Sequence, residues 1–110
     1  MSRPFLLQLA HDSISEVLEA KNILDFDAIL REYPPLKEAI PMTLKIFVKE
    51  ELRGYYEDMA TKSLLENIIT GAKKAAFEDP ASTPLRVTEY FDAEIELTLQ
   101  TPQGIISHRG

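Results

Sequence analysis

Apolar residues recur at a helical spacing in three stretches of the chain. In residues 4–20, leucine, isoleucine and valine side chains cover one side of a helix, and acidic and amide side chains cover the other. Residues 25–33 repeat this spacing over two turns, before a pair of prolines stops them. The third stretch opens with a Ser-x-x-Glu capping box at residues 63–66 and closes with Glu-Asp-Pro at residues 78–80. The sequence therefore predicts three helices.

Other stretches alternate apolar and polar residues, as strands do. Residues 42–48 and 52–57 are rich in β-branched and aromatic side chains, and the polar loop 49–51 between them has the length of a hairpin connection. Residues 93–101 alternate cleanly, with isoleucine and leucine on one face and glutamate, threonine and glutamine on the other. Residues 88–92 have the composition of one helical turn.

The last of these strands indicates the fold class. A strand with one face in water belongs to an antiparallel or mixed sheet that carries its helices on the other face. Helices and strands do not alternate regularly along this chain, so the predicted class is α+β rather than doubly wound α/β. The length of 110 residues fits a single domain, residues 1–110.

Composition narrows the compartment and the partners. The chain has 18 acidic and 12 basic residues, a formal net charge of −6, so nucleic acid is not an expected partner because its phosphates would be repelled. No stretch reaches the roughly 18 apolar residues that a membrane span needs, so we expect no membrane contact and a cytoplasmic location. The absence of cysteine removes thiolate nucleophiles and cysteine-containing metal sites.

The sequence offers no catalytic residue, metal site or cofactor site. It contains no phosphate-binding loop, nucleophile elbow, His-Glu-x-x-His motif or dinucleotide fingerprint. Its two histidines, His11 and His108, stand near opposite ends of the chain, so a metal site built on both would require those ends to meet. His11 falls on the border between the two faces of its helix, where we expect a surface position.

Four motifs follow one another along the chain. They are a hairpin that ends in Leu-Arg-Gly at 52–54, a capped helix that closes with Ala-Ala-Phe-Glu-Asp-Pro at 75–80, Pro-Leu at 84–85, and Ile-Glu-Leu-Thr-Leu at 95–99. In this order they resemble the AMMECR domain, a widespread family named from a human contiguous-deletion region. The family pattern has a hairpin ending in Leu-Arg-Gly-Cys-Ile-Gly, a helix, a Phe-x-Asp-Pro-Arg-Phe-x-Pro-Leu loop, and a strand that ends in Thr-Pro. The resemblance spans roughly residues 6–102.

The chain departs from the family pattern in three respects. Tyr-Tyr-Glu at 55–57 stands where the family has Cys-Ile-Gly, so thiol chemistry cannot run here, and Ala-Ser at 81–82 replaces Arg-Phe. Family domains are also longer, and residues 104–106 are interpreted as the remnant of a later strand. The resemblance implies mixed helices and antiparallel strands, an intracellular setting and, in microbes, association with Memo-like and radical-SAM proteins.

The candidate contact surface is the second predicted strand. Arg53, Tyr55 and Glu57 occupy alternate positions, so their side chains are expected on one side of the sheet. A guanidinium, a phenol and a carboxylate can together bind an anion or a planar ligand, and the alternative is a surface ladder without a ligand. Gly54, on the other side, is expected to mark a bulge or a close backbone approach. Asp79, at the end of the third helix, completes the candidate ligand- or partner-binding residues.

These observations favour a binding or accessory module over an enzyme. It would act on a partner protein or a small anionic ligand, and a homodimer would cover the strand edge that a shortened sheet leaves open. The alternative is an enzyme that acts on a small anionic substrate with Arg53, Tyr55 and Glu57 or Asp79. That alternative predicts a concave pocket around Arg53 and a carboxylate there with a raised pKa.

Overall fold

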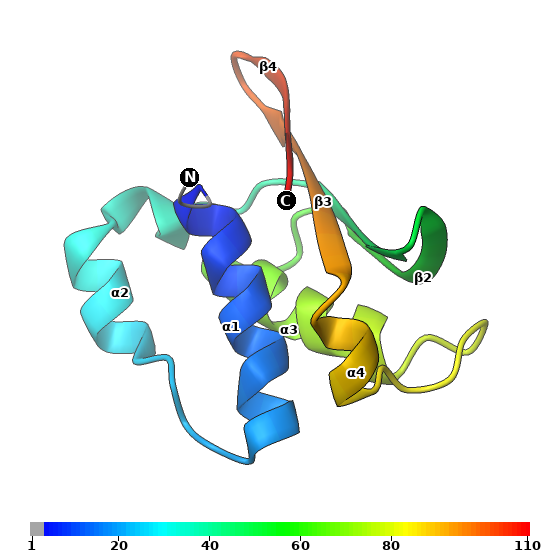
Figure 1. Ribbon diagram of the computed structural model, residues 1–110. Helices are drawn as coiled ribbons and strands as arrows, with labels where there is room; N and C mark the ends of the chain where they lie inside the picture. The colour runs from blue at the N-terminus through cyan, green and yellow to red at the C-terminus, as the bar shows by residue number, and fades with distance from the viewer. Residues whose placement is uncertain (1–3) are drawn as a thin grey trace.

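A computed structural model describes residues 4–110 of the chain (Figure 1). None of the helices in this range is long and apolar enough to cross a membrane. Along the chain the elements are α1 (Phe5–Glu19), α2 (Phe26–Glu32), the 3₁₀ helix η1 (Pro34–Lys37), β1 (Met42–Val48), β2 (Glu51–Asp58), α3 (Leu64–Phe77), α4 (Val87–Tyr90), β3 (Ala93–Thr101) and β4 (Gly104–Arg109).

The strands form one antiparallel sheet in the order β2-β1-β3-β4. β1 and β3 are central, although α3 and α4 separate them in sequence. α1 and α3 pack against each other, and α3 also packs on β1 and β2 while α1 packs on β3 (Figure 1). The predicted α+β class, an antiparallel or mixed sheet with helices on one face, is confirmed, and the sheet is antiparallel.

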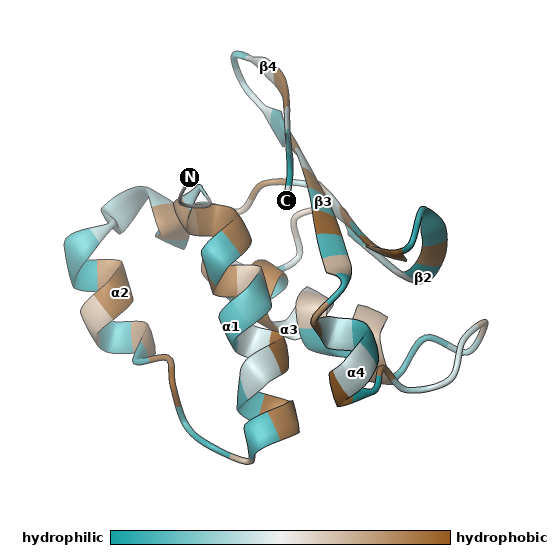
Figure 2. Cartoon of the chain, in the orientation of Figure 1, coloured by the Kyte–Doolittle hydropathy of each residue, from teal (hydrophilic) through white to brown (hydrophobic). Residues whose placement is uncertain are grey.

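The core lies between the sheet and the helices. Leu44 and Ile46 of β1 and Ile95 and Leu97 of β3 are completely buried, whereas Glu94 on the opposite face of β3 is exposed. Apolar and polar residues alternate along β3 in Figure 2. Burying each of these leucine and isoleucine side chains stabilises the fold by about 1.5–3 kcal/mol. We call the uncovered, water-facing side of the sheet the open face.

The structure differs from the predicted elements at two places near strand ends. The polar loop is a two-residue turn formed by Lys49 and Glu50, whose φ angles of 51° and 69° lie in the left-handed region that non-glycine residues rarely adopt. The remnant strand at 104–106 is a full strand, β4, that extends to Arg109. His108 therefore lies in a strand.

His11 is buried, so the expected surface position is wrong. The reason is a contact that helix periodicity cannot reveal. Gly110 continues the β3–β4 ladder by exchanging two hydrogen bonds with Ile95, and its carbonyl oxygen lies 2.9 Å from His11 Nε2. The Tyr90 hydroxyl also donates to the carbonyl oxygen of His11. α1 and the end of β4 therefore do meet.

Candidate functional site

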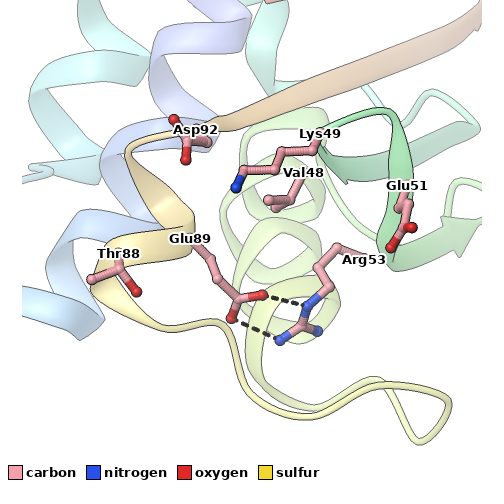
Figure 3. Close-up of a pocket in the computed structure, with 7 residues that line it drawn as sticks. All are labelled: Val48, Lys49, Glu51, Arg53, Thr88, Glu89 and Asp92. Atoms are coloured by element: carbon pink, nitrogen blue, oxygen red, sulfur yellow. Dashed lines mark hydrogen bonds and ion pairs between the residues drawn. The ribbon is translucent and has the colours of Figure 1, made fainter.

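Arg53 occupies a β-bulge in β2. Ile46 of β1 pairs with Gly54, and the next β1 residue, Phe47, pairs with Leu52, so Arg53 is the extra residue between them. A bulge redirects the side chain of its extra residue away from the strict alternation of a strand. The Arg53 side chain accordingly reaches α4 and the loop before it, on the helix-covered side of the sheet (Figure 3).

Arg53 and Glu89 of α4 form an ion pair with two parallel hydrogen bonds. Arg53 Nε donates to Glu89 Oε2 at 2.8 Å, and Arg53 Nη2 donates to Glu89 Oε1 at 2.9 Å. This bidentate geometry is the strongest that arginine forms with a carboxylate. The hydrogen bond from Arg53 holds the pKa of Glu89 below its usual value, and the Arg86 main-chain N–H, which Glu89 also accepts, acts in the same direction.

Arg53 and Asp79 also attach the loop between α3 and α4 to β2. Arg53 Nη1 donates to the Thr83 carbonyl oxygen at 2.8 Å, and Arg53 Nη2 donates to the Thr83 hydroxyl at 3.1 Å. Asp79 Oδ2 accepts the Tyr55 main-chain N–H at 3.0 Å, and Asp79 Oδ1 accepts that of Ala81 at 2.9 Å. Both predicted site residues therefore position this loop.

Tyr55 and Glu57 lie on the open face of the sheet, where Tyr55 pairs with Lys45 of β1. Tyr55 Oη donates to Glu57 Oε2 at 2.8 Å, and this hydrogen bond raises the pKa of Tyr55. The prediction that Arg53, Tyr55 and Glu57 share one side is wrong, because the bulge takes Arg53 out of the alternation. The structure brings Tyr55 and Glu57 together and leaves Arg53 with Glu89.

Gly54 meets both of its sequence-based expectations. It flanks the bulge, and its α-carbon faces α3 so closely that an added Cβ would lie 2.1 Å from the Ala75 carbonyl oxygen. A side chain at this position would collide with the main chain of α3. Gly54 therefore sets the spacing between β2 and α3.

A cleft of about 440 Å³ lies between the β1–β2 turn and α4 (Figure 3). Of the predicted site residues, only Arg53 lines this cleft. No local pattern links the hairpin to residues 88–92, so only the tertiary fold could reveal the cleft. Its lining residues are Val48, Lys49, Glu51, Arg53, Thr88, Glu89 and Asp92.

The charges of this cleft are unequally matched. Arg53 and Glu89 neutralise each other. Lys49, Glu51 and Asp92 take part in no ion pair within the part of the chain that the structure describes. Lys49 extends from the hairpin turn into the cleft, which α4 and Asp92 border on the other side (Figure 3). The cleft thus holds two unpaired carboxylates and one unpaired ammonium, which favours a cationic group. The expectation of an anionic ligand rested on the guanidinium of Arg53, which is already paired with Glu89.

The enzyme alternative predicts a concave pocket around Arg53 and a carboxylate with a raised pKa. The cleft supplies the pocket. The carboxylate beside Arg53 is Glu89, whose pKa is lowered rather than raised. A group that remains ionised in this way does not have the protonation state that a general acid requires at neutral pH.

The contact between α1 and the end of β4 does not create a recognisable metal centre. His11 faces the Gly110 carbonyl oxygen and packs near the Tyr90 ring, with 5.9 Å between the ring centroids. Among residues 4–110, no group of three or more histidine, cysteine, aspartate and glutamate side chains has the arrangement of a metal site.

Comparisons with known proteins give one family and one informative structure. The family model described as AMMECR1 matches residues 7–108. The crystal structure of an uncharacterised protein from Pyrococcus horikoshii matches with a TM-score of 0.75 and 26% sequence identity, over 89% of this chain and 50% of that chain. This chain thus spans half the length of that relative. No curated protein matches this chain.

Proposed function

The chain belongs to the AMMECR1 family, and from that premise we propose that it is a cytoplasmic accessory module that binds a partner protein. The partner would place a cationic side chain in the cleft between the β1–β2 turn and α4. One observation carries this proposal. Glu51 and Asp92 face the cleft without an ion-pair partner among the described residues, while Arg53 is already neutralised by Glu89. A lysine or arginine of the partner would supply the missing positive charge.

The surroundings of the cleft favour a protein partner over a free small molecule. Phe91, which directly precedes the lining residue Asp92, is 80% exposed. Exposed apolar side chains beside a charged depression are typical of protein contact surfaces, where the apolar contacts add affinity and the charges add specificity. The net charge of −6 also favours a basic partner.

The two walls of the cleft are joined to each other before any partner binds, which supports the same proposal. Lys49 and Glu50 adopt left-handed φ angles in the turn that forms one wall. The ion pair between Arg53 and Glu89 joins that hairpin to α4, which forms the other wall. A cleft whose two walls are joined in this way needs little rearrangement to bind, which lowers the entropic cost of association.

The test compares a cationic and an anionic probe by two-dimensional NMR. A blocked Ala-Arg-Ala peptide is expected to shift the amide signals of residues 48–53 and 87–92, and a blocked Ala-Glu-Ala peptide is not. Asp92→Asn should weaken the arginyl peptide about fivefold, the equivalent of a surface ion pair of about 1 kcal/mol. Glu19→Gln removes the same charge at the end of α1 and should leave the affinity unchanged.

Two results would contradict the proposal. One is binding of the glutamyl peptide alone, which would restore the anionic ligand. The other is an equal effect of Asp92→Asn and Glu19→Gln, which would mean that only the overall charge of the chain matters.

A further inference from the structure

The outer edge of β4 carries unpaired backbone groups. In the part of the chain that the structure describes, β4 pairs with β3 alone. The two hydrogen bonds between Ile95 and Gly110 show that the even-numbered residues of β4 point their amides and carbonyls toward β3. Those of Ile105, Ser107 and Arg109 therefore point outward, away from the sheet.

This edge has little of the protection that natural sheet edges carry. Charges, prolines and bulges normally prevent an edge from pairing with another chain. Residues 104–108 contain no Lys, Arg, Asp, Glu or Pro, and the flanking charge of Arg109 is paired with Glu94 at 2.8 Å. Ile105 is 74% exposed and Ile106 43% exposed, on opposite faces of the strand.

The opposite edge of the sheet is protected. β2 has its bulge at Arg53, and the carboxylate of Asp79 occupies the Tyr55 main-chain N–H. β2 also carries several carboxylates, so two β2 edges would repel each other. These acidic residues are Glu51, Glu57 and Asp58.

We propose that β4 pairs antiparallel with β4 of a second copy, around a two-fold axis at Ser107. In this register Ser107 faces its own symmetry mate, and Ile105 faces the partner's Arg109. Three hydrogen-bonded pairs then form, and all the outward amides and carbonyls of β4 are used. The two sheets become one continuous sheet across the interface.

Charge selects a second copy as the occupant. The chain has a net charge of −6, so most faces of two copies repel each other, but residues 104–109 contain no carboxylate. The two Arg109 side chains would stand roughly 14 Å apart along the paired strands, which exceeds the screening length of about 8 Å at physiological salt. This edge can therefore approach its own copy without bringing like charges close together.

The test compares two changes at one position. Analytical ultracentrifugation of the full chain should show a concentration-dependent dimer. Ile105→Pro removes the outward N–H of residue 105, which makes no bond within the sheet, at two symmetric positions and should raise the dimer Kd about tenfold. Ile105→Ala keeps this N–H and should raise the Kd clearly less. Leu52→Ala, at an exposed apolar residue of β2, should leave the Kd unchanged.

Hydrogen exchange supplies a second readout at the edge itself. The amides of Ile105, Ser107 and Arg109 should exchange more slowly as the protein concentration rises. A monomer at concentrations up to about 1 mM would overturn the inference, as would equal Kd values for Ile105→Pro and Ile105→Ala. Binding of a different protein's strand to a monomeric chain would also overturn it. Asp92→Asn should leave the dimer intact, so this test and that of the cleft can fail independently.

Discussion

Gly54 of β2 and Ala75 of α3 touch main chain to main chain: a Cβ added to Gly54 would lie 2.1 Å from the Ala75 carbonyl oxygen and 2.8 Å from its carbonyl carbon. Because these atoms belong to the backbone of a packed helix, they cannot rotate away. We expect Gly54→Ala to lower the free energy of unfolding by about 2–3 kcal/mol, the upper range for overpacking a core. Urea denaturation followed by circular dichroism measures this loss.

Gly71→Ala is the matched control for that experiment. A Cβ on Gly71 would lie 2.5 Å from a ring atom of Tyr56, a side chain that can move because it is only partly buried. Alanine also gains about 1 kcal/mol of helix propensity over glycine inside α3. The loss should therefore be clearly smaller than for Gly54→Ala, and the reverse order would contradict the close approach of β2 and α3.

Arg53→Ala is expected to destabilise the fold. The change removes the bidentate pair with Glu89 and releases the hydrogen bonds to Thr83, so the free energy of unfolding should fall by about 2–3 kcal/mol. Protease cleavage within residues 79–86 should become faster. Arg31→Ala, on the exposed side of α2, should change stability by no more than about 0.5 kcal/mol. Unchanged stability of Arg53→Ala would show that the guanidinium is free to serve a ligand.

The same ion pair predicts a pH dependence at acid pH. The pKa of Glu89 is lowered in the folded chain by its bond to Arg53, so the pair contributes stability above the ordinary glutamate value of 4.5. This contribution is lost as the pH falls through the lowered pKa, because the protonated carboxyl no longer pairs with the guanidinium. The stability difference between the native chain and Glu89→Gln should shrink between pH 7 and pH 3. A constant difference would exclude the charge of Glu89 as its cause.

Tyr55 offers a local titration on the open face. Its pKa is raised above 10.0, first of all by the hydrogen bond to Glu57. Glu57→Gln should lower the pKa of Tyr55 toward 10.0, because the neighbouring negative charge that opposes phenol ionisation is removed. The ¹³Cζ chemical shift of Tyr55 reports this titration. Glu96→Gln, on the same face without a hydrogen bond to Tyr55, should leave the raised value, and an equal effect of both variants would contradict the specific bond.

The sequence was sufficient for the elements whose cause is local. The alternation in residues 93–101 defines β3, Ala93–Thr101, and the capping box places Ser63 before α3, where its side chain accepts the Glu66 main-chain N–H. The one buried face of residues 93–101 was enough to predict an antiparallel or mixed sheet with helices on one face. These features depend on neighbouring residues along one element.

The site could not be predicted in the same way, because its contacts join distant residues. Arg53 meets Glu89 only because a bulge, which depends on pairing with β1, turns the arginine toward α4. Strict alternation of side chains along an isolated strand assigned Arg53 to the wrong side of the sheet. The burial of His11 likewise depends on Gly110, at the other end of the described chain. The register between β1 and β2 and the contact of Gly110 with α1, rather than residue type, determine these positions.

Ala20 provides a stabilising prediction at the end of α1. Its φ of 53° and ψ of 46° are left-handed, and the Lys21 main-chain N–H donates to the Glu16 carbonyl oxygen at 3.0 Å, as in a Schellman motif. The left-handed conformation costs a residue with a Cβ about 1–2 kcal/mol, whereas glycine adopts it freely. Ala20 is exposed, so its side chain contributes little packing. Ala20→Gly should therefore raise the free energy of unfolding by about 0.5–1 kcal/mol, after the larger entropy of glycine in the unfolded chain is subtracted.

Ala28→Gly in α2 is the opposite case, because Ala28 is part of the right-handed helix Phe26–Glu32. There the change gains nothing in the folded chain and should lower the free energy of unfolding by about 1 kcal/mol. Urea denaturation of both variants under one set of conditions makes the comparison. If both changes lower stability, the left-handed end of α1 is not strained, and its geometry must be favoured by contacts beyond the hydrogen bonds of the motif.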